Sequence, residues 1–445
     1  MARGVERFGY DRDAQAVGIV HFGIGAFHRA HQAWYTDRAM DAGDRDWTIL
    51  GVSLRSGVVA AQMNPQDGLY TVTGRSAQGE NSRLVGAVRG VVTAPRASGE
   101  TVDTLAAPTT RIVSFTITEK GYCRAPDGSL DPNLAGEESV FRFLGDGLRR
   151  RRDAGLPGVT LLSCDNLADN GRQLASLMRQ YLDRHDRQLI GWFDAECSSP
   201  NTMVDRIVPA TTEMDRAAIA ERIGVEDQAA VVTEPFSQWV IEDRFAGPRP
   251  RWEAAGAALV DDVAPYESAK LRLLNGAHSA LAYLGLERGH SYVHEAISDP
   301  LLRPVIEHLM REEAAPTIAP APGQDLSRYI DALLQRFANP ALQHRLIQIA
   351  MDGSQKIPQR WLATLADNQR EGRPSPSILR ALGAWLRHVR GDNEARWGEV
   401  ADPRAAELKS LWHKAGADGI AAAVLGSDGL LASAWQPSRQ EQLPL

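Results

Sequence analysis

The stretch Gly18-Ile-Val-His-Phe-Gly-Ile-Gly-Ala-Phe-His28 joins an apolar run directly to two closely spaced glycines. Residues 18–23 are typical of a buried strand, and a helix is predicted from about residue 28 to residue 41. A glycine turn between a strand and a helix lets an anionic group approach the backbone and the helix N-terminus. The stretch therefore predicts the first unit of a dinucleotide-binding α/β fold.

The turn itself holds the first candidate binding residues. Gly23 and Gly25 match two glycines of the G-x-G-x-x-G fingerprint, and His28 stands where the third would be. We take Gly23, Gly25, Phe27 and His28 as candidate cofactor-binding residues. With two glycines alone, a purely structural turn is an equally good interpretation.

A second strand, predicted over residues 47–54, bears on the choice of cofactor. In NAD-binding proteins this strand is usually followed by an acidic residue that binds the adenosine ribose. Here Arg55 and Ser56 follow, and then Gly57 and Val58. Arg55 is a candidate cofactor-binding residue that suits a 2′-phosphate, so these residues leave NAD and NADP both open.

The remaining chain separates into two parts. Further strands are predicted at residues 111–118 and 159–163, with a helical pattern over residues 137–152 between them. Strands that alternate with helices indicate a mostly parallel sheet covered on both faces. After about residue 265, apolar residues recur at helical spacing, as in residues 378–389. We expect an α/β domain over residues 1–260, a mainly helical domain over residues 261–445, and an active-site cleft between them.

Composition narrows the class of protein. The chain has 445 residues and a formal net charge of −7, which disfavours a nucleic-acid-binding protein. No apolar run approaches the roughly 20 residues that span a bilayer, and the N-terminus lacks an apolar signal core. Three cysteines stand far apart without zinc-site spacing. We expect a cytoplasmic protein without a metal site.

The segment Tyr266-Glu-Ser-Ala-Lys-Leu-Arg-Leu-Leu-Asn-Gly-Ala-His-Ser279 carries the main catalytic candidates. On a helix at about 100° per residue, Lys270, His278 and Asn275 fall at roughly 0°, 80° and 140°. Interconversion of an alcohol and a carbonyl needs a proton-transferring group and hydrogen bonds to the developing alkoxide. A lysine with a lowered pKa and an asparagine amide suit these tasks. A core helix with a partly buried lysine is the competing interpretation.

Two further segments place polar residues near predicted strand ends. Asp165 and Asn166 follow residues 159–163, at the edge where α/β enzymes bind ligands, although a turn and helix cap also explains Asp165. Asp205 and Arg206 are adjacent opposite charges within an apolar run. A buried structural ion pair is as good an interpretation of them as a direct role.

Together these segments resemble the polyol-specific long-chain dehydrogenases, a family that includes mannitol 2-dehydrogenase and fructuronate reductase. The likeness extends from about residue 17 to residue 360. Its most specific motifs are Thr118-Glu-Lys-Gly-Tyr122, Ser163-Cys-Asp-Asn166, Met203-Val-Asp-Arg-Ile207, Glu234-Pro-Phe236, Trp239-Val-Ile-Glu-Asp243 and Leu274-Asn-Gly-Ala-His278.

The resemblance implies a Rossmann-type N-terminal domain, a helical C-terminal domain and metal-independent, NAD-dependent catalysis. It also implies a role for each of several side chains. These are Lys270 as general acid/base, Asn166 and Asn275 as the alkoxide-stabilising pair, His278 as a substrate-orienting residue, Lys356 and Asp205 as substrate contacts, and Glu267 as a proton relay.

The substrate is less narrowly defined. Gln348 stands where mannitol dehydrogenases place an arginine, and residues 348–359 look closer to fructuronate reductases. The leading hypothesis is interconversion of fructuronate and mannonate, with Lys356, supported by Arg360 or Arg345, binding the carboxylate. Oxidation of mannitol, arabinitol or a related polyol is the alternative, and a non-catalytic dinucleotide-binding regulator is a more distant one. We expect a monomer or small homo-oligomer.

Overall fold

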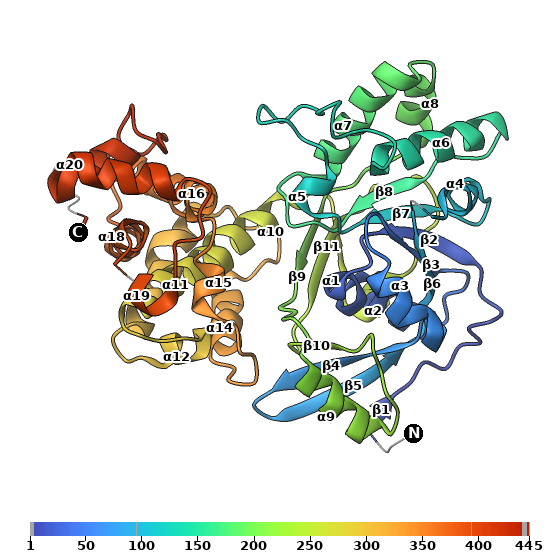
Figure 1. Cartoon of the computed structure of the whole chain (residues 1–445), viewed down its shortest axis with the longest axis horizontal. Helices are drawn as coiled ribbons and strands as arrows, with labels where there is room; N and C mark the ends of the chain where they lie inside the picture. Colours follow the sequence, from blue (N-terminus) through green and yellow to red (C-terminus); the bar gives the residue numbers. More distant parts are fainter. Residues whose placement is uncertain (1–3, 95, 393, 438–442, 445) are drawn as a thin grey trace. The chain divides into compact units, whose positions relative to one another are not determined.

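The computed structural model describes residues 4–94, 96–392, 394–437 and 443–444. The chain forms two compact units, Met1–Val263 and Ala264–Leu445. The first contains every named strand, and the second is built from helices (Figure 1).

The first unit is organised around a five-stranded sheet in the order β6-β3-β2-β7-β8. Every neighbouring pair in this sheet is parallel. Its strands are β2 (Val17–Phe22), β3 (Thr48–Ser53), β6 (Val88–Thr93), β7 (Ile112–Phe115) and β8 (Thr160–Ser163). This is the Rossmann-type arrangement that the alternating strand and helix patterns predict, and the predicted fold class is confirmed.

Helices cover both faces of this sheet. Successive side chains along each strand point to opposite faces, so a strand that is apolar throughout must be covered on both sides. In Figure 1, α1 and α2 lie on one side of the sheet and α6 and α7 on the other. Ile19 of β2 belongs to a core that includes residues of α1 and α2, whereas its neighbour Val20 packs in a core with α6 and α7. The helices of this unit are α1 (Ala26–Ala30), α2 (Gln32–Asp41), α3 (Val58–Met63), α4 (Ser98–Ala106), α5 (Thr118–Gly121), α6 (Val140–Asp153), α7 (Asn170–His185), α8 (Leu189–Glu196) and α9 (Glu213–Ile223), with the 3₁₀ segments η1 (Asn64–Gln66) and η2 (Trp252–Ala255).

Two smaller sheets complete the unit. One has the order β1-β5-β4-β10 and the other the order β12-β11-β9. Their strands are β1 (Val5–Glu6), β4 (Tyr70–Ser76), β5 (Gly79–Val85), β10 (Val231–Thr233), β9 (Thr202–Asp205), β11 (Gln238–Glu242) and β12 (Ala258–Val260).

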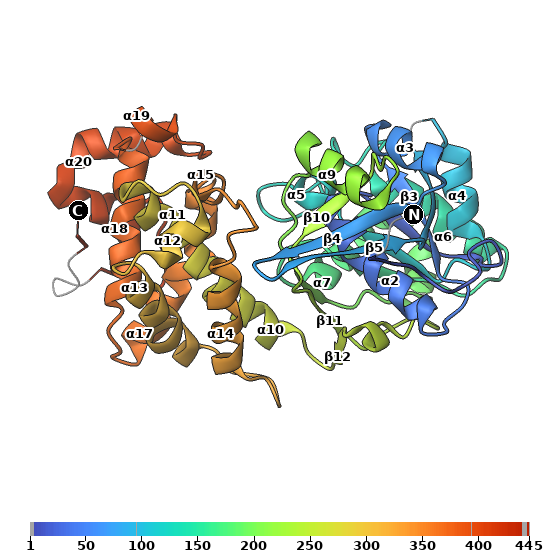
Figure 2. The same ribbon diagram turned by 90° about the horizontal axis from the view of Figure 1, so that it is seen from below.

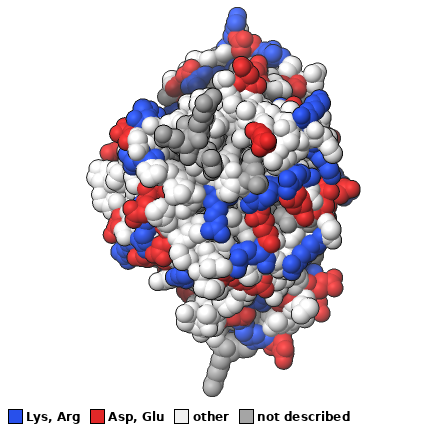
Figure 3. Space-filling view, turned by 90° about the vertical axis from the view of Figure 1, so that its left-hand side faces the viewer, with Lys and Arg blue, Asp and Glu red and all other residues white. Residues whose placement is uncertain are grey.

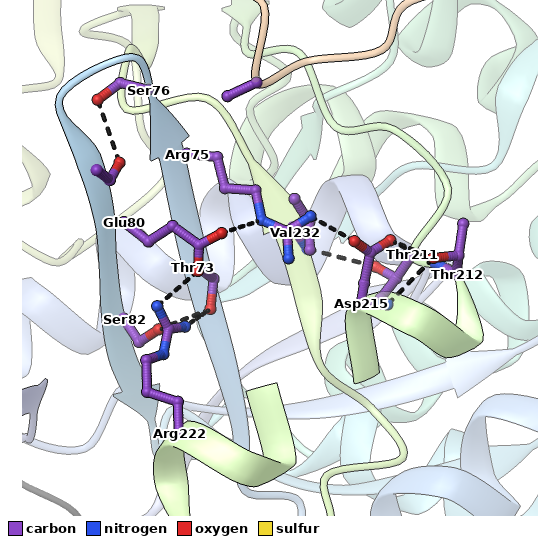
Figure 4. Close-up of polar contacts among 12 residues, drawn as sticks. Thr73, Arg75, Ser76, Glu80, Ser82, Thr211, Thr212, Asp215, Arg222 and Val232 are labelled. Atoms are coloured by element: carbon purple, nitrogen blue, oxygen red, sulfur yellow. Dashed lines mark hydrogen bonds and ion pairs between the residues drawn. The ribbon is translucent and has the colours of Figure 1, made fainter. Parts of the chain in front are cut away.

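A chain of ion pairs ties α9 to the β4–β5 hairpin (Figure 4). Arg75 of β4 pairs with Asp215 of α9 and, at 2.6 Å, with Glu80 of β5. Glu80 also pairs at 2.6 Å with Arg222 of α9, whose guanidinium donates to Thr73 as well. The charges alternate in sign along this series of ion pairs: the carboxylate of Glu80 lies between two arginines, and that of Asp215 pairs with one. This network fixes the helix against the hairpin.

The second unit is helical, as its apolar spacing predicts (Figure 2). Its core includes the fully buried Trp361, Trp385 and Trp435. Its helices are α10 (Ala264–Ala269), α11 (Gly276–Glu287), α12 (Val293–Ser298), α13 (Arg303–His308), α14 (Leu326–Phe337), α15 (Leu346–Ile349), α16 (Gly353–Ile357), α17 (Ala363–Arg370), α18 (Pro376–Arg390), α19 (Glu394–Trp397) and α20 (Ala405–Leu425), with the short 3₁₀ segment η5 (Ala315–Thr317).

Three segments of this unit are π-helical, with hydrogen bonds from residue i to residue i+5. They are η3 (Lys270–Asn275), η4 (Leu309–Ala314) and η6 (Pro358–Leu362). The segment η3 continues α10 and runs into α11, so one long helix contains a wider turn in its middle. Such turns are rare and occur often at functional sites.

The surface has mixed charge. On the face drawn in Figure 3, basic and acidic side chains are interspersed. Within the described residues, no helix combines the length and the apolar character required to cross a membrane.

Candidate functional site

In the first unit, most of the candidate residues lie on segments that start from one edge of the five-stranded sheet, whereas Asp205 ends β9 of another sheet. Because the sheet is parallel, the segments that leave the carboxyl ends of β2, β3, β7 and β8 start from the same edge. These segments carry the glycine turn at 23–25, Arg55, Thr118 and Asn166. Open α/β sheets bind their ligands at this edge.

The two glycines of the turn serve different purposes. Gly23 has a φ of 93°, and a Cβ there would lie 2.1 Å from the carbonyl oxygen of Thr116, so this position requires glycine for the fold itself. Gly25 is exposed, and the nearest atom that a Cβ there would meet is the Gly23 carbonyl oxygen, 3.9 Å away. The space above Gly25 is therefore open to an incoming group. The turn fits the pyrophosphate of a dinucleotide.

His28 lies beneath this turn and not on its surface. Its side chain is fully buried and stacks on His21 of β2, with 3.4 Å between ring centroids. Burial, followed by the nearby His21, holds the pKa of His28 well below its usual value, so the ring is neutral. His28 fills the place that a third glycine takes where the helix packs closely on the strand. Phe27 is half-buried and stacks on His31 at 5.1 Å.

Arg55 lies at the end of β3 and is exposed. It forms no ion pair with any carboxylate of the described chain. Val58, three residues further on, is 60% exposed. The positions that follow β3 thus present one free cation and no acidic group to the edge of the sheet.

Asp165 organises the segments after β7 and β8. Its carboxylate accepts hydrogen bonds from the backbone N–H of Ile117 at 3.0 Å and of Thr118 at 2.9 Å, and from the hydroxyl of Tyr122 at 2.9 Å. Burial raises the pKa of Asp165 and these three donors oppose the rise. Thr118 has a φ of 60°, which is unfavourable for a β-branched residue. Asp165 thus stabilises the strained turn that follows β7, and it directly precedes the exposed Asn166.

Arg206 does not make the ion pair with Asp205 that the sequence allowed as one interpretation. Its guanidinium donates to the carbonyl oxygens of Ala30 and of Glu234, the latter at 3.2 Å, and lies 4.9 Å from the ring centroid of Trp34. Burial lowers the pKa of Arg206 to about 10. Asp205 ends β9 and is buried as well, with 4% of its surface exposed.

In the second unit, Lys270 and Asn275 begin and end the π-helical turn η3. The α-helical spacing assumed from the sequence, which spreads these residues about 140° apart, is wrong for this segment. A π-turn bonds residue i to residue i+5 and is wider than an α-helical turn, so residues five apart lie closer to the same side of the helix than they would in an α-helix. The wider turn therefore brings Lys270 and Asn275 onto one face.

His278 follows on α11 and is buried. Its ring lies 4.6 Å from that of Phe337 and 5.4 Å from that of His344. Burial, then the nearby His344, Arg336 and Arg360, keep the pKa of His278 well below its usual value. The imidazole is therefore neutral, with one nitrogen able to donate and the other able to accept a hydrogen bond.

Lys356 and Glu267 lie on other segments of the same unit. Lys356 of α16 donates to the carbonyl oxygens of Met351, at 2.5 Å, and Ile349, at 3.4 Å. Burial, then the charge of Arg360, lower the pKa of Lys356. Glu267 is half-buried in α10, three residues before Lys270.

Arg360 and Arg345, which the sequence predicts as possible helpers of Lys356 in binding the carboxylate, have different environments in the structure. Arg345 is exposed, whereas Arg360 is partly buried and donates to the carbonyl oxygen of Asn275 at 3.3 Å and to the hydroxyl of Ser279 at 2.7 Å. Burial lowers the pKa of Arg360 to about 10. Its contact with the end of η3 depends on residues 85 positions apart, so no local sequence signal identifies it.

The described residues contain no evident metal-binding site. Among them, no group of three or more His, Cys, Asp or Glu side chains is arranged to hold an ion. Cys123, Cys164 and Cys197 are all free thiols.

Comparison with known proteins identifies the family. The mannitol dehydrogenase Rossmann domain matches residues 17–254, and the mannitol dehydrogenase C-terminal domain matches residues 262–431. The oxidoreductase YeiQ of Escherichia coli, itself uncharacterized, is 43% identical over 90% of this chain and 85% of its own. The D-mannonate oxidoreductase of Escherichia coli is 39% identical over 96% of this chain and 91% of its own.

A solved structure agrees with these matches. Mannitol 2-dehydrogenase of Pseudomonas fluorescens, in a ternary complex with NAD and D-mannitol, superposes with a TM-score of 0.81. It is 37% identical in sequence, and the match covers 92% of this chain and 87% of that one. Both domain matches and both levels of identity lead to the same conclusion: this chain belongs to the mannitol dehydrogenase family of oxidoreductases.

Proposed function

We propose that this chain is an NAD-dependent reductase of a keto-uronate, interconverting D-fructuronate and D-mannonate. The observation that carries the proposal is the pair Lys356 and Arg360. These cations lie four residues apart on the continuous α16–η6 helix, where such residues are neighbours. Neither forms an ion pair with a carboxylate of the described chain. A partly buried positive pair with no carboxylate in direct contact suits a substrate that carries a carboxylate.

Similarity supports the same substrate class. The D-mannonate oxidoreductase of Escherichia coli matches nearly the full length of both chains. Gln348, where mannitol dehydrogenases place an arginine, is a further difference from the polyol-specific members. Membership of an oxidoreductase family also makes the non-catalytic regulator a poor explanation for this chain.

In this proposal the dinucleotide binds over the turn that carries Gly23 and Gly25, with His28 shaping the turn from below and Phe27 and Arg55 beside it. NAD supplies the hydride acceptor for the oxidation. Lys270, as the neutral amine, takes the proton from the reacting hydroxyl, and Glu267 passes that proton toward solvent. The amides of Asn166 and Asn275 donate to the alkoxide oxygen as its charge develops.

The remaining residues orient the sugar acid. The neutral imidazole of His278 hydrogen-bonds a hydroxyl of the substrate, and Lys356 binds its carboxylate. Asp205 accepts a hydrogen bond from a hydroxyl further along the chain of the sugar. In the reduction the same groups act in reverse, with protonated Lys270 as the acid.

Oxidation of a free polyol is the second candidate. It is favoured by the similarity to the solved mannitol 2-dehydrogenase. The two functions are separated by assaying NADH oxidation with D-fructuronate and with D-fructose, which differ in the group at the far end. We expect kcat/KM for the uronate to exceed that for the ketose by about 30-fold or more, the effect of a lost charge-assisted hydrogen bond. Equal or reversed values would establish the polyol function instead.

A further inference from the structure

We propose that Arg360 is a positioning residue for catalysis, which keeps Lys270 and Asn275 aligned by holding the end of the π-turn η3. The inference rests on the proposed function, because that function makes these two residues act on the same oxygen. It gives Arg360, whose charge the proposed function places near the substrate carboxylate, a second role that acts through the backbone of Asn275.

Two side-chain contacts meet the junction of η3 and α11. Arg360 Nη1 donates to the carbonyl oxygen of Asn275 at 3.3 Å, and Trp361 Nε1 donates to the carbonyl oxygen of Gly276 at 3.1 Å. The same Nη1 donates to the hydroxyl of Ser279 at 2.7 Å. Two consecutive carbonyls thus receive side-chain donors from consecutive residues of η6, at the point where the wide turn ends.

A π-turn needs such support because it competes with ordinary α-helix. Well under 1% of residues in globular proteins are π-helical. If η3 relaxed to α-helix, Lys270 and Asn275 would separate to about 140° around the axis. Each backbone carbonyl has two lone pairs, so Asn275 and Gly276 can accept from the side chains in addition to any backbone donor. The extra donors favour the conformation in which both carbonyls face η6.

The surroundings of Arg360 argue against a purely structural ion pair. A buried cation is costly unless a carboxylate accompanies it, and Arg360 has none within the described residues. Arg272, on the same π-turn, shows the ordinary arrangement, since it pairs with Asp367 at 2.6 Å and donates to the carbonyl oxygen of Thr317 at 3.0 Å. Of these two arginines, Arg360 directs its guanidinium at the backbone of the turn and Arg272 does not.

The test compares Arg360→Met, Arg360→Lys, Trp361→Phe and the control Arg311→Met, on the separate π-turn η4, in the full-length protein. We expect Arg360→Met to lower kcat about 10- to 100-fold, since a misplacement of about 1 Å can cost about 100-fold. The dissociation constant for NADH should stay within about twofold, and Arg360→Lys, which keeps a donor, should recover part of kcat. Arg311→Met, which removes the ion pairs of Arg311 with Glu307 and Asp331, should lower Tm but change kcat less than about threefold.

A double-mutant cycle separates positioning from general destabilisation. If Arg360 acts through Asn275, then Arg360→Met should lower kcat by less than about threefold in an Asn275→Ala background, because residues that act together are not additive. A full further loss in that background would overturn the proposal. Should Arg360→Met fail to fold, Arg360→Lys and Trp361→Phe are measured in the same cycle and judged by the same criterion.

Failure of this inference is distinct from failure of the proposed function. If Lys270→Ala retains the turnover of the parent, the proposed function is wrong, and so is the positioning role of Arg360 that depends on it. If Lys270→Ala is inactive while Arg360→Met and Trp361→Phe both keep kcat within about threefold, the proposed function stands and only the role of Arg360 is overturned.

Discussion

Lys270 and Asn275 are the first and last residues of a single π-helical turn, so the proposed proton-transferring amine and one proposed alkoxide donor share one side of the helix. In an α-helix they would point in clearly different directions. The local widening is therefore a precondition for the two groups to serve one substrate oxygen. The roles proposed for these two residues can be tested by mutagenesis.

Replacing Lys270 tests the general acid/base. Lys270→Ala should lower kcat by about 10²- to 10⁴-fold, the range typical of a lost proton-transferring group, while NADH affinity stays nearly unchanged. Steady-state kinetics and fluorescence titration with NADH measure the two effects. Lys414→Ala, at an exposed position, is the matched control. A variant with turnover within about tenfold of the parent would remove Lys270 from the mechanism.

Cofactor choice is predicted to be modest. We expect NAD to be preferred over NADP by roughly tenfold in kcat/KM, or about 1.4 kcal/mol. The preference is no larger because no carboxylate near Arg55 repels the 2′-phosphate of NADP. Val58→Asp should widen the preference by adding a ribose acceptor and like-charge repulsion. Val225→Asp, at another exposed valine, should leave the ratio unchanged. A strong preference of the parent for NADP would contradict the assignment of NAD.

Lys356 is predicted to recognise the carboxylate of the substrate. Lys356→Met should raise KM for a uronate by about 30- to 150-fold, or about 2–3 kcal/mol, and affect a neutral ketose far less. KM for both substrates is compared with that of Lys409→Met, which removes an exposed lysine. An equal loss on both substrates would mean that Lys356 binds a hydroxyl common to them, which favours the polyol function.

The buried histidines predict how stability depends on pH. Burial lowers the pKa of His21 to about 3, from an ordinary value of 6.5. As pH falls below 6.5 the unfolded chain binds a proton at His21 that the folded chain does not bind, so the free energy of unfolding decreases until pH reaches about 3. Well inside this window His21 contributes a slope of about 1.4 kcal/mol per pH unit.

Urea unfolding between pH 7.5 and pH 5 measures this slope. His21→Gln should reduce it by the equivalent of about one proton, although the variant is less stable throughout. His413→Gln, at an exposed position, is the control. An unchanged slope in His21→Gln would show that His21 binds its proton as readily in the folded chain as in the unfolded chain. His28, His278, His344 and His388 have lowered pKa values too and act in the same direction.

The sequence predicts the parallel sheet well for a physical reason. Strands buried on both faces are almost continuously apolar, so β2, β3, β7 and β8 stand out from their surroundings. The π-turn leaves no such trace, because its composition is that of an ordinary amphipathic helix. A wheel drawn at a constant angle therefore misplaces Asn275 relative to Lys270.

Long-range contacts account for the other differences. Arg206 stands next to Asp205 in sequence but donates to carbonyls at Ala30 and Glu234, because burial favours several well-placed acceptors. His28 lies within the cofactor-binding motif, yet its side chain faces the interior and stacks on His21. A side chain at the position of the third glycine of that motif has to lie between the helix and the strand. Neither outcome can be inferred without knowing which segments the fold brings together.

The left-handed conformation of Thr118 has a consequence for engineering this chain. Such a backbone costs roughly 1–2 kcal/mol in a non-glycine residue, and here hydrogen bonds to Asp165 offset it. Glycine at this position would relieve the cost, so a selection for heat resistance would be drawn to it. The same replacement would loosen the segment beside Asn166. If Asn166 acts as proposed, thermal stability and the placement of its amide therefore compete at a single residue, Thr118.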